Sequence, residues 1–450
     1  MAFDIRVLES HDDLIQAGNL FRTAMIGFPP LDATQRDLIG KLLEPGRTLG
    51  AFVDGRLAAT ADSTTSTLTL PGGERVGHAG VTHVGVLPTH TRRGLATALL
   101  EHQLRDIAAR GEAVATLRAS EATIYERFGY AVASTSSTVE LLTARAALRP
   151  GVGSGGPVRL LDPTEAWDIL PRIYTANRPP RAGTIDRIAG WWQGQRLRSD
   201  AAPGAKYVAV HGNPGDETGF VRYHPVDTDS WFVSSERTVV VDDLFAPTEH
   251  AYLGLLRFLL DLDLVDKLVF SMVPLDDPLP WLLVDRRAAR LTATRDETWL
   301  RVTDAAAVLG ARSYAGPGNV TIGVKDSLLQ QNSATFAISS DGAERTDAAP
   351  QLHIGIAALG AVLLGGASWR DLAPAGLVRV HDPAALAIAT DLFNTGEARI
   401  RASTSERRRP GPATRLARRP PPPQWDPRQR TPRSARRPPR GTGPAHHLPR

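Results

Sequence analysis

The 450-residue sequence contains no cysteine. Disulfide bonds, thiolate zinc sites and cysteine nucleophiles are therefore excluded. The sequence also lacks a long apolar run. The longest, residues 354–366, is shorter than the ~20 residues that a membrane helix needs, and glycines interrupt it. The first five residues do not follow the basic-then-apolar order of a secretory signal. We expect a cytoplasmic protein with no membrane span and no bound metal.

Acidic residues are scarce in the last part of the chain. Residues 399–450 contain 15 arginines and 12 prolines but only two acidic residues, so residues 1–398 hold 37 basic and 46 acidic side chains. The net charge of +4 for the whole sequence therefore conceals a body with a net charge of −9. An acidic body attracts cationic substrates, although many soluble proteins are mildly acidic without such a role.

The arginine- and proline-rich segment has too few large apolar side chains to form a core, and we expect it to be disordered. A basic segment of this kind can bind nucleic acid nonspecifically through the phosphates. The same composition also results from out-of-frame translation of a GC-rich gene, which is the interpretation we favour. Nucleic acid is therefore not an expected partner of the rest of the chain.

A strand–turn–helix pattern carries most of the information on function. Residues 81–87 are rich in β-branched side chains and predict a strand, which Pro88 helps to end. Apolar residues then recur at helical spacing. Between them, Gly94 lets a ligand approach the backbone, and the start of the helix offers N–H groups and the positive end of the helix dipole. With Arg92 and Arg93 beside it, this turn suits a pyrophosphate or a phosphate, although an ordinary turn with surface arginines fits the same pattern.

This arrangement resembles the acetyl-CoA-binding signature of the GNAT superfamily of N-acetyltransferases. In that signature Gln or Arg is followed, after two residues, by Gly-x-Gly or Gly-x-Ala. Gly94 and Ala96 match the pattern, whereas Thr91 stands where the family has Gln or Arg. Further along the chain, Tyr125 to Tyr130 resembles the family's aromatic segment, in which a helix ends at a glycine and a strand follows. The two matches together are more specific than either alone.

The resemblance is closer to one branch, the enhanced intracellular survival proteins of actinobacteria, and covers residues 1–398. Its motifs in this sequence are Arg92–Leu95, Ala119–Glu121, Tyr125–Tyr130, Leu279–Leu283 and Trp299–Val302. The resemblance implies an acetyl-CoA-dependent N-acetyltransferase that acts on primary amines of a small polycation, such as an aminoglycoside, or of lysine. It also implies a homo-hexamer.

The resemblance further implies a mixed α/β (α+β) fold with two tandem acetyltransferase-like domains and a sterol-carrier-like α/β domain. The order βααβββαβαβ that the first part of the chain predicts agrees with this fold. No basic-glycine turn precedes the helix of the second domain, and the resemblance implies that this domain is degenerate and without a cofactor site of its own. Residues 151–156 match a dinucleotide-binding pattern but open no helix, and we interpret them as a linker. The expected divisions are 1–150, 157–290 and 291–398, followed by the disordered tail 399–450.

Local patterns predict several individual elements. In the first domain they predict strands at residues 3–8, 81–87, 113–117 and 130–141, helices at 12–24 and 33–43, and a hairpin around Asp54-Gly55. In the third domain they predict strands at 299–302, 320–324 and 334–338, and helical or small apolar patterns at 352–359, 369–372 and 383–393. Trp191 and Trp192 are expected in the core of the second domain.

Amide formation requires that the thioester is held, the amine is neutral, the oxyanion is stabilised and the leaving thiolate is protonated. We expect strand backbone to hold the pantetheine and the carbonyl, and turn backbone to hold the pyrophosphate. The resemblance implies that Ser120 and Glu121 lie beside the cofactor. The predicted cofactor-binding residues are Val84, Gly85, Val86, Arg92, Arg93, Gly94, Leu95, Ala96, Thr97, Ser120 and Glu121.

Tyr125 is the expected proton donor. A free phenol titrates near pH ~10 and a thiol near ~8.5, so donation to the thiolate is uphill by about 1.5 units, which a positioned acid tolerates. A packing role for this tyrosine is the alternative. His83, His90 and His102 have no partners at a useful spacing and are not expected to be catalytic. The resemblance implies that the general base is a C-terminal aromatic carboxylate, but this sequence ends at Leu448-Pro449-Arg450, which leaves the base open.

A function from another class stays open. The third domain could bind an apolar ligand, which would make the chain a lipid-binding or scaffold protein with a silent acetyltransferase fold. The presence of Arg92, Arg93, Gly94 and Tyr125 argues against a silent fold.

Overall fold

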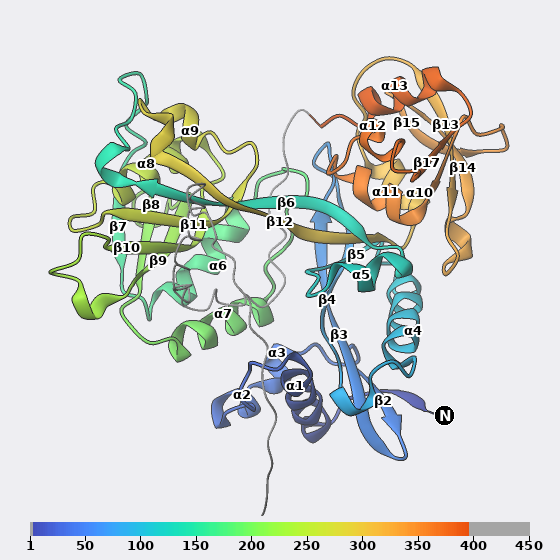
Figure 1. Cartoon of the computed structure of the whole chain (residues 1–450), viewed down its shortest axis with the longest axis horizontal. Coiled ribbons are helices and arrows are strands. Elements are labelled where there is room, and N and C mark those ends of the chain that lie inside the picture. The colour runs from blue at the N-terminus through green and yellow to red at the C-terminus, as the bar shows by residue number, and fades with distance from the viewer. Residues whose placement is uncertain (1–2, 396–450) are drawn as a thin grey trace, which may run out of the picture. The chain divides into compact units, whose positions relative to one another are not determined.

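The computed structural model describes residues 3–395. The predictions for the tail and for the C-terminal carboxylate lie outside these residues. Within the described range, no helix has both the length and the apolar character that a bilayer crossing requires. The strands form one twelve-stranded and one five-stranded sheet, with helices packed on both (Figure 1). This architecture confirms the predicted fold class.

The first part of the chain follows the predicted order of elements. The hairpin at Asp54-Gly55 is confirmed, because it joins two antiparallel strands. The single helix expected at residues 33–43 is instead two short helices, because Leu38 between them leaves helical geometry with φ −96° and ψ 3°. The elements are β1 (Asp4–Val7), α1 (His11–Met25), α2 (Ala33–Asp37), α3 (Ile39–Leu42), β2 (Leu49–Val53), β3 (Arg56–Thr69), β4 (Arg75–Val86), η1 (Pro88–His90), α4 (Leu95–Ala109), β5 (Val114–Leu117), α5 (Ala122–Tyr125), η2 (Glu126–Phe128) and β6 (Ala131–Leu142).

The second part repeats this plan. A parallel pair again follows an antiparallel meander, and a helix connects the two parallel strands. Trp192 is buried and Trp191 packs against the same cluster, which confirms their core position. The elements are β7 (Val158–Leu161), α6 (Ala166–Ala176), α7 (Ala189–Ala201), β8 (Tyr207–His211), β9 (Gly219–Val226), β10 (Thr238–Phe245), α8 (Glu249–Leu260), β11 (Lys267–Pro274), α9 (Leu279–Leu282) and β12 (Ala289–Val302).

Two long strands join the halves of the large sheet. β6, from the first half, pairs antiparallel with β11, and β12, from the second half, pairs antiparallel with β5. β6 and β12 also pair with each other, so the order through the middle is β5-β12-β6-β11 (Figure 1). The strand predicted at residues 299–302 is therefore the end of β12 and belongs to the large sheet. Each half contributes a strand to the other, and this exchange makes one continuous sheet.

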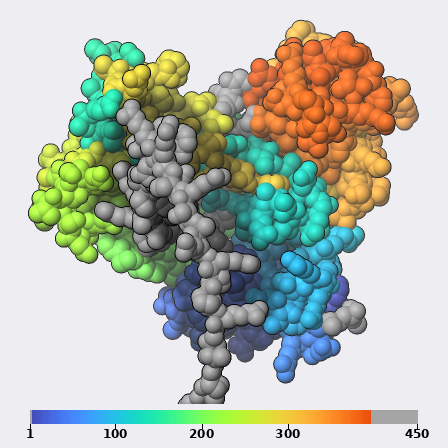
Figure 2. Space-filling view, in the orientation of Figure 1, coloured from blue at the N-terminus to red at the C-terminus, as the bar shows by residue number. Residues whose placement is uncertain are grey.

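The third part forms the small sheet, in the order β15-β14-β13-β16-β17. Residues 352–355, expected within a helical or small apolar pattern, form a strand parallel to β13, and the helix begins only afterwards. The core of this part continues into the large sheet through Ala133 of β6 and through Leu300 and Val302 of β12. Figure 2 shows its orange surface against the teal surface of the first half. The elements are α10 (Ala305–Ala311), β13 (Asn319–Lys325), β14 (Ala334–Ser339), β15 (Gly342–Thr346), β16 (Leu352–Gly355), α11 (Ile356–Leu363), α12 (Trp369–Leu372), β17 (Val378–Val380) and α13 (Pro383–Leu392).

His78 makes the stability of the sheet sensitive to acid. The side chain is buried where β4 pairs with β5, and its Nε2 lies 2.7 Å from the Thr116 hydroxyl. Burial, helped by the charges of Arg178 and Arg47, lowers the pKa of His78 from 6.5 to about 3. Below pH 6.5 the unfolded chain therefore binds a proton at His78 that the folded chain binds only near pH 3. The stability that neutral His78 contributes to the folded state is complete above pH 6.5 and is lost as the pH falls from 6.5 toward 3.

We expect His78 to remove roughly 2 kcal/mol of folding free energy between pH 7 and pH 5. Urea denaturation of the wild type and of His78→Leu at both pH values measures this difference. The variant should be less stable at pH 7 because the Thr116 hydroxyl loses its partner, but its stability should fall less with acid. His102→Gln, at an exposed position, serves as the control and should keep the wild-type slope. An equally steep decline in His78→Leu would show that other groups cause the acid sensitivity.

Candidate active site

The large sheet has a gap in its ladder between β4 and β5, where backbone groups of β4 are not paired with β5. β4 pairs with β5 only from His78 to Gly80, and its remaining residues diverge from that neighbour. On its other side, β4 pairs with β3 through a bulge: Thr82 lies opposite Asp62 and Gly85 opposite Thr60. Two residues, His83 and Val84, therefore stand opposite the single residue Ala61 of β3. Backbone groups of the diverging segment are thus available to a ligand on the β5 side.

Gly85 explains how closely α1 approaches this segment. A Cβ on Gly85 would lie 3.1 Å from the Cβ of Ala24 and 3.4 Å from the Cα of Phe21, both on α1. A larger residue would push the helix away from the strand. Gly85 therefore shapes the site by packing, while Val84 and Val86 on either side are partly buried against neighbouring clusters.

The start of α4 suits an anion. Gly94 precedes the helix with φ +83°, a conformation that favours glycine, and no side chain caps the helix. The first backbone bond into the helix is from the Ala98 N–H to the Gly94 carbonyl. The N–H groups of Leu95, Ala96 and Thr97 therefore point out of the helix end toward the place where an anion would bind.

The predicted residues around this turn differ in how they could act. Arg92 and Arg93 are exposed, and Arg92 has φ +61°, so both side chains stand on the surface at the helix start. Leu95 is 2% exposed and its side chain belongs to the core. Only the backbone of Leu95 can therefore contact a ligand, whereas the two arginines can contribute charge. These features fit the phosphates of a coenzyme A group.

The aromatic segment lies beside the end of β5. Tyr125 is 6% exposed and shares a cluster with Phe128 and Tyr130, against which Val84 also packs. Gly129 ends the segment with φ +86°, and a Cβ there would lie 2.8 Å from Nε of Arg301. The tight turn therefore requires glycine on two grounds. The structure brings Tyr125 and the diverging strand together.

Two further predicted residues act on the Tyr125 hydroxyl. Burial raises the pKa of Tyr125, a hydrogen bond with Ser120 lowers it, and the charge of Glu121 raises it. The net effect is a pKa above the ordinary value of 10. Tyr125 is therefore protonated at neutral pH and has a proton to donate. It is also a weaker acid than a free phenol, so its advantage as a donor must come from its position.

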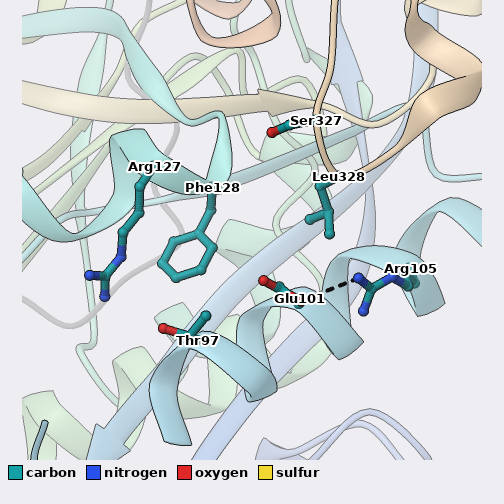
Figure 3. Close-up of a pocket in the computed structure, with 7 residues that line it drawn as sticks. All are labelled: Thr97, Glu101, Arg105, Arg127, Phe128, Ser327 and Leu328. Atoms are coloured by element: carbon teal, nitrogen blue, oxygen red, sulfur yellow. Dashed lines mark hydrogen bonds and ion pairs between the residues drawn. The ribbon is translucent and has the colours of Figure 1, made fainter. Parts of the chain in front are cut away.

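A groove of about 260 Å³ lies beside α4, which lines it with Thr97, Glu101 and Arg105 (Figure 3). Its arginines come from two elements: Arg105 is bonded to Glu101 at 3.2 Å, and Arg127 lies over the ring of Phe128 at 5.0 Å. The opposite wall comes from the loop after β13, more than two hundred residues later in the chain. No local pattern in the sequence indicates that wall. The lining residues are Thr97, Glu101, Arg105, Arg127, Phe128, Ser327 and Leu328.

The three histidines have different surroundings. His102 is exposed on α4, and His90 in η1 is bonded to the neighbouring Thr89 hydroxyl at 2.8 Å. His83 lies in the β4 bulge, where its Nδ1 is 3.4 Å from Oδ2 of Asp62. This partner was not recognised from the sequence, because it comes from the adjacent strand and no spacing along the chain indicates it. Across residues 3–395, no group of three or more side chains is placed to hold a metal ion.

The corresponding position in the second half is built differently. α8 is capped by Thr248, whose hydroxyl accepts a bond from the Ala251 N–H, and Pro247 precedes the cap. The β10 bulge lies next to Asp243, which forms a buried bidentate pair with Arg187 at 2.7 and 3.0 Å. The Arg187 guanidinium also lies 4.4 Å from the ring centre of Tyr174. Protein groups thus occupy both the helix start and the space beside the bulge.

Three family models match successive parts of the chain. Models of the acetyltransferase (GNAT) domain match residues 4–133 and 183–302, and a sterol carrier protein domain model matches residues 305–401. An uncharacterized N-acetyltransferase of Streptomyces avermitilis is 34% identical over 405 residues, which cover 88% of this chain and 98% of the relative. N-acetyltransferase Eis of Mycobacterium tuberculosis is 36% identical over 326 residues, or 70% of this chain and 77% of that protein.

The crystal structure of Eis1 from Mycobacterium abscessus superimposes with a TM-score of 0.83 at 47% identity, covering 88% of this chain and 99% of that one. The match thus covers 77% to 99% of the length of these three proteins. The enzyme class and the actinobacterial branch that the sequence motifs suggested are confirmed. The chain belongs to the Eis-like N-acetyltransferases of the GNAT superfamily.

Proposed function

We propose that this enzyme transfers the acetyl group of acetyl-CoA to a primary amine of a small polycation, such as an aminoglycoside, or of a lysine side chain. The observation that carries the proposal is the uncapped start of α4 beside the diverging end of β4. GNAT acetyltransferases use acetyl-CoA, and these two features fit its pyrophosphate and its pantetheine. In the second half, Thr248 caps the helix start, and the Arg187–Asp243 pair lies beside the bulge. We therefore propose one acetyl-CoA site in each chain.

We assign roles to the residues as follows. The backbone N–H groups of residues 95–97, with Arg92 and Arg93, bind the pyrophosphate. The backbone of Val84 and Val86 binds the pantetheine and polarises the thioester carbonyl. Tyr125 protonates the departing thiolate, and Ser120 orients its hydroxyl. Acetyl-CoA supplies the activated acyl group, and the chain contributes position, charge and protons.

The net charge supports a cationic acceptor. Residues 1–398 carry a net charge of −9, which raises the local concentration of a polycation around the protein. Such attraction acts mainly on the second-order rate constant and weakens as salt screens it. We therefore expect kcat/KM for a polycation to fall with ionic strength, while that for a monoamine changes little.

The absence of cysteine makes this expectation simple to test, because a thiol reagent then reports only released CoA. Full-length enzyme would be assayed with an aminoglycoside, a lysine peptide and a monoamine between low and physiological salt. We expect the polycation to be the best substrate and its kcat/KM to decrease several-fold over that range. A monoamine that is equally fast at low salt would contradict the acceptor class. Absence of both acetyl-CoA binding and acetyl transfer would contradict the proposed function itself.

The third domain is better suited to support than to carry a lipid. Its buried side chains pack against one another and against residues of β6 and β12. At its junction with the large sheet, Arg301 is 0% exposed and donates two bonds to Asp326, at 2.9 and 2.7 Å. Both bonds come from Nη2 of Arg301, and this buried ion pair fixes the position of the third domain against the sheet. Native mass spectrometry for co-purified lipid would test the carrier function.

We further propose that the protein is cytoplasmic and forms a homo-hexamer. We propose that each chain consists of three domains, at residues 1–150, 157–290 and 291–398. The oligomer rests on the resemblance, and exposed apolar side chains support it, among them Trp281 at 64% and Leu291 at 63%. Light scattering on the eluting protein would give the mass directly. A monomeric mass at micromolar concentration would exclude the hexamer.

A further inference from the structure

Two histidines meet on the outer face of the small sheet. Side chains alternate along a strand, so Leu352 and Ile354 of β16 enter the core of the third domain while His353 between them points outward. His381 follows the end of β17, the strand next to β16, and its backbone N–H donates to the Gln351 carbonyl at 2.9 Å. Nδ1 of His353 and Nε2 of His381 lie 2.8 Å apart. Both residues are exposed, so small solutes can reach the pair.

Gly323 makes room for the ring of His353. It lies opposite His353 on the parallel neighbour β13, and a Cβ on Gly323 would stand 2.6 Å from Cδ2 of the imidazole. A larger residue would push the ring away from the sheet. The imidazole of His353 therefore lies over the backbone of the neighbouring strand, and the pairing of the strands fixes where it meets His381.

The bond between the two rings requires that they are not both fully protonated. One of the facing nitrogens donates a proton and the other accepts it with a lone pair. Burial, the neighbouring His381 and the charge of Arg379 lower the pKa of His353. His353 is therefore mainly neutral at pH 7, and neutral imidazole is the form that binds metal ions. Arg379 also repels a metal cation, but it is exposed, and solvent and salt screen this repulsion.

The spacing of the two nitrogens suits a late transition metal. Imidazole nitrogens bind such ions at about 2.0 Å, which places adjacent ligands about 2.8 Å apart in square-planar geometry and about 3.3 Å apart in tetrahedral geometry. The observed separation of 2.8 Å matches the first. A small rotation of each exposed ring turns both lone pairs toward one ion, which takes the place of the shared proton. We propose that His353 and His381 form a surface site for a divalent transition metal, with Cu(II) bound most tightly and water in the remaining positions.

Titration of the full-length protein with Cu(II) in a non-coordinating buffer tests this site. We expect His353→Ala and His381→Ala each to weaken the tightest binding step about tenfold or more, because a chelate of two ligands becomes a single ligand. The double variant should bind little worse than either. Electron paramagnetic resonance below one equivalent should show two coupled imidazole nitrogens in the wild type. The sequence contains one adjacent pair of histidines, His446 and His447, and His446→Ala/His447→Ala should keep the tight step.

Two glycines on the same face of the sheet separate the position of the rings from the presence of the ligands. Gly323→Ala keeps both histidines but displaces the ring of His353, so its Cu(II) affinity should fall several-fold or more. Gly355→Ala, two residues along from His353, is the matched control and should bind like the wild type. Within residues 3–395, no atom beyond the chain neighbours of Gly355 lies within 4 Å of its built Cβ.

The titration uses no acetyl donor or acceptor, so its outcome is independent of the proposed acetyl transfer. Thermal denaturation without metal identifies any variant that does not fold, and the remaining variants then decide the question. If His353→Ala and His381→Ala bind Cu(II) as tightly as the wild type, or if the tight step is lost only in His446→Ala/His447→Ala, the inference is wrong. Loss in both single variants and in Gly323→Ala, with retention in Gly355→Ala, would place the metal between the two rings.

Discussion

Tyr125→Phe should lower kcat by about 10²-fold or more and leave acetyl-CoA affinity unchanged. The substitution removes one hydroxyl from a side chain that is 6% exposed, and the ring keeps its place among Phe128 and Tyr130. The thiolate must then leave without a proton or take one from water. Equilibrium titration with acetyl-CoA and steady-state turnover, measured on the same preparation, separate binding from chemistry.

Tyr130→Phe is the matched control for this prediction. Tyr130 is 0% exposed, its ring centre lies 6.0 Å from that of Tyr125, and its hydroxyl has no hydrogen-bond partner among the described residues. Burial raises the pKa of Tyr130 well above its ordinary value. Removing a buried hydroxyl without a partner should leave turnover unchanged and stability equal or slightly higher. If Tyr125→Phe turns over like Tyr130→Phe, the proton donor is another group.

The pH dependence of turnover gives an independent check. Because the pKa of Tyr125 is raised above 10, the phenol keeps its proton throughout the stable range of most assays. The rate of the wild type should therefore show no decline on the alkaline side up to pH ~10. A loss of activity near pH 8 would indicate that a stronger acid donates the proton.

The sequence predicts those parts of the site that depend on short-range chemistry. A strand, a turn with Gly94 and an apolar helical period must produce a helix start with open N–H groups, whatever the rest of the chain does. Gly129 likewise marks the end of the aromatic segment, because its φ of +86° suits glycine. Each of these features depends on a few neighbouring residues, and each lies where it was expected.

Features that depend on pairing between distant segments were not predicted. The exchange of β6 and β12 between the halves is set by ladder contacts, and a β-rich segment such as residues 299–302 can add to either sheet. The pair of His83 and Asp62 depends on the β3–β4 register, which is shifted by one residue at the bulge. Leu328 reaches the α4 groove only because the third domain packs against the first. Local patterns contain no information on these registers.

Gly94→Val should weaken acetyl-CoA binding by roughly 10- to 100-fold, the loss expected when one or more charge-assisted hydrogen bonds of about 1.5–3 kcal/mol cannot form. Among residues 3–395, and apart from its two chain neighbours, no atom lies within 4 Å of a Cβ built on Gly94, so these residues leave room for the new side chain, which would obstruct a ligand there. Because φ at this position is +83°, the valine also strains the backbone. The loss of affinity must therefore be separated from a loss of stability.

Gly111 provides that separation. It follows the other end of α4 and has φ +77°, and in the described part of the chain no atom beyond its two neighbours lies within 4 Å of a built Cβ. Gly111→Val should thus lose similar stability, because its backbone strain is comparable, while it binds acetyl-CoA as tightly as the wild type. Thermal denaturation and calorimetric titration of the two variants give both quantities. If Gly94→Val binds acetyl-CoA as tightly as Gly111→Val, the pyrophosphate lies away from the start of α4. If only Gly94→Val loses affinity, then the space next to Gly94 and the N–H groups behind it form the phosphate site.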